Sequence, residues 1–578
     1  MKVVYLSLLL LSLNFCALAQ TLPVGLLENV EDAYRRQQLL GKDSSNTSYM
    51  IRPMFMSDRN SLTLDPDTNY SLLKFRKLLY NNPKLHTQIY ALPVSWQHQF
   101  NSHHPYGMND GSMVQARGYQ TQLSAGIYAK IGPLSIQFRP EYVFAENKGF
   151  QRLADAPNGV YWNSPVTGSY FNRIDLPDRF QDGNYSKFSL GQSSVRLNVG
   201  PISAGFSNEN LWWGPGMRNS LLMSNNASGF RHLTLNTTKP IKTYIGSFEA
   251  QVIGGRLEQS GVSLKNDLTV PQAVRNELLD KGYDWRYISG IVLTYQPKWV
   301  PGMFLGFDRT FIVNRSKMGR RFGDYFPIFS KVDKVGYVTP EGTYSEDAAE
   351  RDQYISFFTK YVFTESKAEV YFQYGRNDHS YDLRDLAVEP EHTRAYILGV
   401  RKLVPLKKLD EYIQIGLELT QLERTTTGQL RDYPTWYVHG QVLDGYTHQG
   451  QVLGAGIGPG SNLQTLDVSW VKGLKRIGIQ FERKVNNNDL FYDFSFASAD
   501  RRQYINRHWV DLSVGGNLSW NHKSFVINAQ LTYIKSLNYQ YQWQDSIPAG
   551  DYWNWFKQDA NNLHAKLGLV YLFNQTYK

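Results

Sequence analysis

The chain has 578 residues with a net charge of +10, and 14% of its residues are aromatic, including 38 tyrosines and 13 tryptophans. Its single cysteine excludes a disulfide framework, and a sequence without basic runs or binding motifs argues against a nucleic-acid partner. The modest excess of basic residues instead suits acidic partners, such as lipopolysaccharide or an anionic glycan.

The sequence begins with the pattern of a secretory signal peptide. Lys2 supplies a positive charge, an apolar segment runs from Val3 to about Phe15, and Ala17 and Ala19 form a small-residue cleavage site. Cys16 lies inside this signal peptide, and Asn14-Phe15 before it are not the small residues that a lipoprotein needs. We therefore predict export, with residues 1–20 as the signal peptide. Beyond it, no run of about 18 apolar residues predicts a transmembrane helix.

The next region, residues 21–85, is predicted to be helical. An amphipathic stretch runs from Val24 to about Gly41, a glycine suited to end a helix. A second stretch, from about Asn69 to Tyr80, has leucines and a phenylalanine near helical spacing. Together they predict a small periplasmic helical segment, with a plug inside a β-barrel as the alternative.

From about Thr87 onward apolar and polar residues alternate, which is typical of β-strands with one apolar face. The clearest hairpin alternates over residues 119–130, turns at Gly132-Pro133 and alternates again over residues 134–144, where Pro140 predicts an irregularity. The pattern recurs at residues 195–202, 368–374, 413–420, 525–533 and 563–573. A coarse count gives about 16–18 strands, enough for a barrel with a lumen.

A soluble sandwich and a membrane barrel both show this alternation, but two features favour the barrel. The aromatic content is high although the mean hydropathy is −0.43, as expected for a lipid-facing belt around a wet lumen. The polar faces carry Arg139, Glu141, Glu369 and Glu418, and we expect these acids to pair with bases across the interior.

We therefore predict an all-β fold, a transmembrane β-barrel of antiparallel strands in the outer membrane, over residues 86–578. The segments 146–192, 256–284, 316–350 and 425–462 are predicted loops, either extracellular or folded inward.

One segment is more specific than this alternation. Residues 208–227 read Asn-Glu-Asn-Leu-Trp-Trp-Gly-Pro-Gly-Met-Arg-Asn-Ser-Leu-Leu-Met-Ser-Asn-Asn-Ala. An aromatic-Gly-x-Gly turn followed by Ser-Leu-Leu-x-Ser-Asn-Asn-Ala resembles the signature of the Wzi family of capsule-assembly proteins, and the signal end and loops look closest to its Bacteroidota branch. Further segments between about residues 87 and 480 resemble the same family: Phe100–Gly111, Arg351–Gln353, Gln373–Asp378 and Gly445–Gly458.

The resemblance implies an outer-membrane barrel of about eighteen strands with a helical bundle on its periplasmic side. It also implies a lectin-like surface protein that attaches or organises capsular polysaccharide or exopolysaccharide at the cell surface. The expected partners are this polysaccharide and the outer membrane with its lipopolysaccharide, together with a possible periplasmic partner bound through the N-terminal helices.

The motif also offers candidate glycan contacts. Trp212 and Trp213 present flat rings on which the C–H faces of sugars can stack, and Arg218, Asn225 and Asn226 could bond hydroxyl or acid groups. The alternative is a role in folding, with the tryptophans packed inside and the asparagines satisfying an inward-folded loop. The sequence leaves both interpretations open.

Other chemistry finds little support. His103 and His104 are adjacent, so their side chains point to opposite faces of a strand and make a poor metal chelate. The sequence has no Gly-x-Ser-x-Gly elbow and no glycine-rich phosphate loop, so we predict no enzymatic activity, no metal and no cofactor. Arg320-Arg321 and Lys331–Lys334 are either solvated loop charges or a site for lipopolysaccharide phosphates or an acidic polymer.

Two other functions are compatible with a barrel. A porin or channel for oligosaccharides or small solutes would need an open lumen and would conduct ions. An accessory subunit of another surface export system would bind a partner through residues 21–85. The bulky loops and the tryptophan-glycine motif favour an occluded lumen, and hence the lectin-like function.

Overall fold

The computed structural model describes most of the chain after the signal peptide. The described residues are 20–55, 77–153, 170–329, 337–338, 344–345, 350–377, 383–425, 433–497, 508–541 and 559–573, without positions 27, 44, 269, 271 and 283. Residues 1–19 of the predicted signal peptide and residues 69–76 of the second predicted helix lie outside this part.

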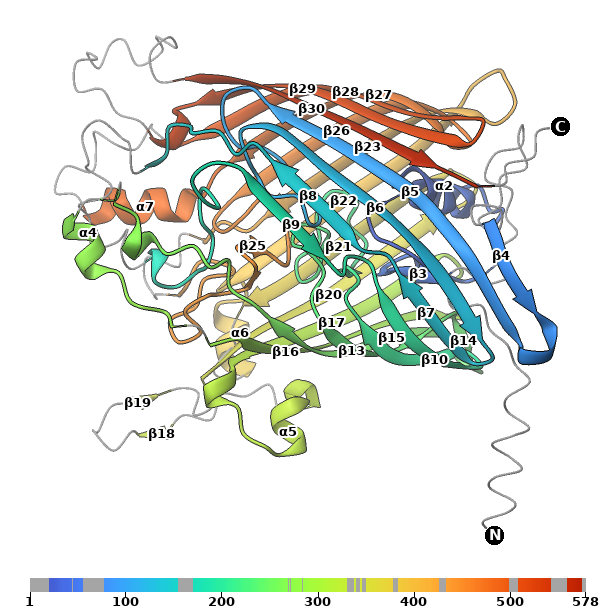
Figure 1. The fold of residues 1–578 in the computed structure, drawn as a ribbon, viewed down its shortest axis with the longest axis horizontal. Helices are drawn as coiled ribbons and strands as arrows, with labels where there is room; N and C mark the ends of the chain where they lie inside the picture. Colours follow the sequence, from blue (N-terminus) through green and yellow to red (C-terminus); the bar gives the residue numbers. More distant parts are fainter. Residues whose placement is uncertain are drawn as a thin grey trace.

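Antiparallel strands form one closed sheet around a central axis (Figure 1). In chain order these strands are β5 (Thr87–Asn101), β6 (Gly118–Ile131), β7 (Leu134–Phe138), β8 (Glu141–Ala145), β9 (Tyr185–Ser189), β10 (Ser194–Val199), β11 (Ile202–Ser207), β13 (His232–Thr237), β14 (Ile241–Lys242), β15 (Gly246–Leu257), β16 (Arg286–Pro297), β17 (Met303–Asn314), β20 (Arg351–Phe363), β21 (Ala368–Asn377), β22 (Arg394–Pro405), β23 (Glu411–Gln421), β26 (Asn462–Lys472), β27 (Lys475–Val485), β28 (Val510–His522), β29 (Phe525–Leu537) and β30 (Ala560–Tyr571). Strand β30 closes the ring by pairing with β5, from His564 opposite Asn101 to Tyr571 opposite Val94.

The barrel wall has eighteen staves, where a stave is a strand that runs along the wall, interrupted or not. Three staves are interrupted: β7 with β8, β9 with β10, and β13 with β14. Pro140 lies at the break between β7 and β8, so the irregularity predicted there is confirmed. A further short strand, β4 (Lys77–Asn82), pairs with the first half of β5, on the edge whose second half pairs with β30.

Side chains alternate between the outside of the barrel and its lumen, because successive residues of a strand lie on opposite faces. On β23, Ile415 and Leu417 point outward and are 39% and 44% exposed, whereas Gln414 and Glu418 point inward and are buried. The other strands predicted from the sequence repeat this pattern. Apolar residues thus cover the outside, as lipid requires, and polar residues line the lumen, which confirms the predicted transmembrane β-barrel.

The two ends of the barrel differ in their connections. At one end the staves are joined by tight turns, such as Gly132-Pro133 and Gly200-Pro201, where both glycines have positive φ angles of 58°. At the other end the connections are long, among them residues 208–231 and 422–461. In outer-membrane barrels the short turns face the periplasm and the long loops face the cell exterior. Helix α2 (Glu28–Leu39) and β4 lie at the periplasmic end, on the right of Figure 1.

The N-terminal region combines this helix with short strands. Helix α2 falls within the predicted stretch from Val24 to Gly41, and β1 (Thr21–Leu22) pairs with β3 (Met54–Phe55). The second helix was predicted wrongly at its end, because residues 77–80 belong to β4. There the backbone hydrogen bonds to β5 outweigh the helical spacing of the leucines.

The remaining elements are short and lie in the N-terminal region or in the connections between strands. They are η3 (Pro83–Leu85), β2 (Ile51–Arg52), β12 (Trp212–Trp213), η5 (Leu264–Asn266), α4 (Gln272–Glu277), η6 (Arg315–Lys317), α5 (Phe322–Tyr325), η7 (Pro327–Phe329), β18 (Tyr337–Val338), β19 (Tyr344–Ser345), α6 (Leu383–Val388), β24 (Thr447–His448), β25 (Gln451–Val452), α7 (Asn488–Ala497) and η10 (Tyr539–Tyr541). Among the described residues, no helix is long and apolar enough to cross a membrane.

The outward face of β23 provides a test of this arrangement. Leu417→Arg should lower the free energy of unfolding in lipid vesicles by about 2–4 kcal/mol, because it places a charge in the lipid-facing belt. The matched control is Leu409→Arg in the periplasmic turn after β22, where Leu409 is already 86% exposed. That control should change stability by less than about 1 kcal/mol. Equal losses in a denaturant titration would contradict the placement of Leu417 against lipid.

Candidate functional site

The connection between β11 and β13 folds into the lumen and carries the predicted motif. Near its start, the buried carboxylate of Glu209 accepts a hydrogen bond from Arg196 Nη2 on β10 at 2.7 Å. Trp212 and Trp213 follow as β12, which pairs with β2 of the N-terminal region. The motif is therefore joined to the N-terminal region inside the barrel.

The two tryptophans are buried in different surroundings. Trp213 is fully buried, donates a hydrogen bond from Nε1 to Gln251 Oε1 at 2.9 Å, and fills the space that a side chain at Gly290 would need. Trp212 is 3% exposed, and the guanidinium carbon of Arg52 lies 4.8 Å from the centre of its ring. Among the described residues the indole N–H of Trp212 has no hydrogen-bond partner.

A carboxylate of the barrel wall holds the glycine turn that follows. A side chain at Gly216 would collide with the carbonyl oxygen of Asn219, so only glycine allows this close approach. Glu418 on β23 accepts hydrogen bonds from the backbone N–H groups of residues 217–219 at 2.7–3.1 Å. The prediction that Glu418 pairs with a base is therefore wrong, because three backbone donors occupy its carboxylate instead.

The predicted polar residues of the motif bind other parts of the protein. Arg218 forms a two-point ion pair with Glu482 on β27, at 2.7 and 3.0 Å. Asn225 Nδ2 donates to the backbone carbonyl of Asn109 at 2.8 Å, and Asn226 Nδ2 donates to a carbonyl in β25 at 3.0 Å. The structure thus brings all five predicted residues into one inward-folded segment that connects several loops. These contacts favour a role in folding, while direct contact with a glycan stays a prediction.

The second half of the motif packs against the long connection between β23 and β26. Leu221, Leu222 and Met223 are at most 1% exposed. The Tyr437 hydroxyl donates a hydrogen bond to the Leu221 carbonyl oxygen at 2.8 Å, and a side chain at Gly454 would lie 2.1 Å from this same oxygen. The described part of this connection therefore folds inward, which was one of the two arrangements predicted for it.

Buried ion pairs attach α2 to the lumen wall. Arg35 pairs with Glu369 on β21 at 2.8 Å, and Glu369 also pairs with Arg401 on β22 at 3.1 Å. Arg401 in turn contacts Asp32 of the helix. The predicted pairing of Glu369 with bases is confirmed, although one of its partners comes from the helix. Glu141 differs from the prediction, because its hydrogen bonds come from Ser112 and Gln192.

The carboxylate of Asp32 is the centre of this attachment. Burial raises its pKa, but the positive charges of Arg36, Arg401 and Arg476 outweigh burial and hold the pKa well below its usual range. Asp32 therefore stays ionised and keeps compensating these guanidinium groups. Alternation along the strands predicts which wall residues face inward, but it does not reveal which helix residue meets them.

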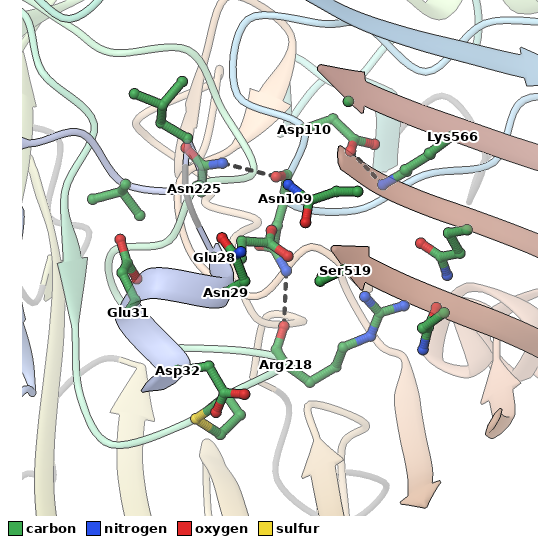
Figure 2. A pocket seen from close by; sticks show the side chains of 18 of the residues that line it. Glu28, Asn29, Glu31, Asp32, Asn109, Asp110, Arg218, Asn225, Ser519 and Lys566 are labelled. Atoms are coloured by element: carbon green, nitrogen blue, oxygen red, sulfur yellow. Dashed lines mark hydrogen bonds and ion pairs between the residues drawn. The ribbon is translucent and has the colours of Figure 1, made fainter. Parts of the chain in front are cut away.

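A cavity of about 360 Å³ lies between α2 and the inward-folded loops (Figure 2). The ion pair between Asp110 Oδ1 and Lys566 Nζ, at 2.5 Å, lies on one side of it. This volume far exceeds the ~30 Å³ of one water molecule, and the polar lining suits water or a small polar molecule. Labelled lining residues come from α2, from the loops and from strands β28 and β30: Glu28, Asn29, Glu31, Asp32, Asn109, Asp110, Arg218, Asn225, Ser519 and Lys566. Of the predicted glycan contacts, Trp212, Arg218 and Asn225 line the cavity.

The prediction that His103 and His104 point to opposite faces of a strand is wrong, because β5 ends at Asn101 and the chain bends over residues 102–104, which brings the two rings together. His104 stacks on Tyr539, with ring centres 4.5 Å apart, and its Nδ1 lies 3.1 Å from Nδ1 of His103. In the part of the chain that the structure describes, no group of three His, Cys, Asp or Glu side chains could hold a metal ion.

Comparison with known proteins adds a family and a fold. Residues 97–530 match the family model of the capsule assembly protein Wzi. No curated protein sequence matches the chain significantly. Among solved structures, the chain resembles Wzi of Escherichia coli, an outer membrane protein involved in group 1 capsule assembly and a carbohydrate-binding β-barrel. The TM-score is 0.56 at 13% identity, over 96% of this chain and 99% of that one, so the likeness concerns the fold.

More distant matches come from other bacteria. OccAB2 of Acinetobacter baumannii has a TM-score of 0.38 at 8% identity, covering 83% of this chain and 98% of its own. OccK2 of Pseudomonas aeruginosa, solved with glucuronate, has a TM-score of 0.34 at 8% identity, covering 84% and 98%. Neither likeness is strong enough to support an argument.

The ion pairs of α2 generate a prediction. Asp32→Ala should weaken the docking of α2 by about 3–5 kcal/mol, because it leaves buried guanidinium groups without their counter-charge. Hydrogen–deuterium exchange of the α2 amides in the detergent-solubilised protein measures this loss. The matched control is Asp410→Ala, which removes the exposed pair with Lys42 just after the helix. Its effect should stay below about 1 kcal/mol.

The same measurement has a pH dependence with a fixed sign. The pKa of Asp32 is lowered in the folded protein. Its contribution to the docking free energy of α2 is therefore complete above the ordinary pKa range of a carboxyl group, and it is lost as the pH falls toward the lowered pKa. In the Asp32→Asn variant, the protection of the α2 amides against exchange should not show this loss at low pH. An unchanged α2 in both Asp32 variants would show that other contacts hold the helix.

The close approach at Gly454 generates a second prediction. Gly454→Ala should destabilise the inward-folded loop by about 1–3 kcal/mol, because the new methyl group would overlap the Leu221 carbonyl. Gly440→Ala in the same connection is the control, since nothing lies within 4 Å of a side chain there. Limited proteolysis of folded protein should cut the Gly454 variant faster. Equal cutting rates would mean that this contact does not hold the loop.

Proposed function

The chain belongs to the family of the capsule assembly protein Wzi, and from this membership we propose that it is an outer-membrane, lectin-like protein that attaches or organises capsular polysaccharide or exopolysaccharide at the cell surface. In this proposal the protein binds the polymer without converting it chemically. The binding face is the exterior end of the barrel, where the long loops lie.

The segments inserted into the lumen are the observation that favours this proposal over a porin. Helix α2 occupies the lumen on the periplasmic side of the cavity, and residues 208–231 with the loop around Tyr437 occupy it on the exterior side. A channel needs a continuous path for water, and these inserted segments narrow the lumen on both sides of the cavity. The exterior surface is therefore a more accessible binding site for a polymer than the lumen is.

The motif in residues 208–227 lies in the lumen below this exterior surface and holds its loops in place. Its contacts with Glu418, Glu482 and the loop around Gly454 fix several exterior connections relative to one another. Many weak contacts across such a fixed surface hold a repetitive polymer by avidity, without one deep binding site. The net charge of +10 suits an acidic polymer.

An accessory subunit that works through its N-terminal helix finds less support. Ten of the twelve residues of α2 are buried, so this helix offers little surface to a partner. A periplasmic partner would have to bind elsewhere in residues 21–85, and a pull-down with that region deleted would test it.

Deletion of the gene tests the proposal. Total surface polysaccharide should stay unchanged, while the cell-bound fraction falls and the shed fraction rises. An acidic-sugar assay or antibody applied to cell pellets and culture supernatants measures both fractions. Unchanged fractions would refute the lectin-like function, and stable conductance steps of the purified barrel in planar bilayers would favour a porin.

Complementation of the deletion strain separates glycan contact from folding. Trp212→Phe removes an indole N–H that has no partner among the described residues, whereas Trp213→Phe removes the hydrogen bond to Gln251. If Trp212 contacts the glycan, Trp212→Phe should reduce retention of the polymer without lowering the melting temperature. Full retention with Trp212→Phe would assign the residue to folding.

A further inference from the structure

Three arginines gather on the outside of the barrel near its exterior end. Arg231 directly precedes β13, and its carbonyl accepts a hydrogen bond from the backbone N–H of Arg256 on β15 at 2.9 Å. Arg231 shares its outward face with Leu233 and Leu235, which are 63% and 51% exposed. Two residues along a strand correspond to about 7 Å, so the arginine lies just above the lipid-facing belt.

An aromatic ring and a carboxylate hold these guanidinium groups in place. Trp285, just before β16, lies between Arg256 and Arg315, whose guanidinium carbons are 5.1 and 6.0 Å from its ring centre. Glu258 Oε1 lies 3.2 Å from Arg231 Nη2 and 3.2 Å from Arg256 Nε. We call Arg231, Arg256 and Arg315 the arginine rim.

The connection after β17 adds to the same outer face. It carries Arg320, Arg321 and α5, which lies outside the barrel wall next to β16 in Figure 1. The Tyr287 hydroxyl of β16 donates a hydrogen bond to the Tyr325 carbonyl at 3.1 Å, so this segment rests on the wall. Phe322 remains 72% exposed beside Arg321. An exposed aromatic flanked by arginines is suited to the boundary between acyl chains and charged headgroups.

We propose that the arginine rim binds phosphate groups of lipopolysaccharide in the outer leaflet of the membrane. The guanidinium fork matches phosphate oxygens with two parallel hydrogen bonds. Within the described residues, the three arginines outnumber the nearby carboxylates, which are Glu258 between Arg231 and Arg256 and Asp284, which accepts from the backbone next to Arg315. The leucines below the rim fit the acyl chains of the same molecule. Because the rim faces outward from the wall, directly above the belt, its geometry suits a neighbouring lipid better than a polymer on the loops.

The proposal is independent of polysaccharide attachment, and purified protein tests it. In detergent, lipid A with two phosphates should raise the melting temperature of the wild type, whereas dephosphorylated lipid A should not. The triple variant R231Q/R256Q/R315Q should lose this shift, and native mass spectrometry should show at least about tenfold weaker lipid A binding. The matched control is Arg483→Gln, which changes an exposed arginine on β27 two residues from the outward-facing Phe481.

Several outcomes would overturn the proposal. These are equal binding by the triple variant and the wild type, equal shifts with phosphorylated and dephosphorylated lipid A, or an equal loss with Arg483→Gln. A rim-dependent response to a lipid-free acidic polysaccharide alone would reassign the rim to the polymer. Heat-modified migration in gels reports whether each variant folds. If the triple variant does not fold, Arg315→Gln with the same pair of lipids decides.

Discussion

In a lipid bilayer every backbone N–H and C=O group of a strand needs a partner within the protein, because the hydrocarbon offers none. The chain meets this constraint with eighteen staves that pair with their neighbours around a full circle. Once the circle is closed, alternation sends every second side chain into the lumen. A barrel of this size has a lumen too wide for wall side chains alone to fill. Helix α2 and the connection after β11 supply the additional chain that fills it.

The charges of the lumen wall have a structural task in this arrangement. Glu369, Glu418 and Glu482 lie on three different strands, and each holds an inserted element: α2, the glycine turn and Arg218. Burying ions costs free energy, and their mutual attraction offsets that cost only when partners and geometry fit closely. Such contacts therefore specify where the inserted elements sit. A polar lumen face in this barrel marks attachment points, whereas in a porin it would mark the wall of a water channel.

Much of the wall could be predicted from the sequence. Period-two alternation reveals the strands and their outward faces, the Gly-Pro pairs mark two periplasmic turns, and Pro140 marks a break. The resemblance in residues 208–227 is confirmed by the family match and the fold. Local spacing was misleading at residues 77–80, because pairing with a distant segment overrides helical periodicity.

Long-range partners could not be predicted in the same way. Alternation shows that Glu418 faces inward, but not that a backbone turn would use its carboxylate. The tryptophan motif was recognisable, yet its position inside the lumen depends on pairing with β2. The arginine rim likewise joins three residues whose proximity comes only from the register of β13, β15, β16 and β17.

The shared edge of β5 has a consequence for assembly. Nearly every other strand pairing in the wall joins strands that are neighbours in sequence, and such pairings form quickly. The pairing of β5 with β30 instead joins the two ends of the chain and carries a large entropic cost of loop closure. β4 covers the first half of that β5 edge through a local hairpin. During folding only the second half of the edge has to wait for its partner, which shortens the stretch of open strand that another chain could capture.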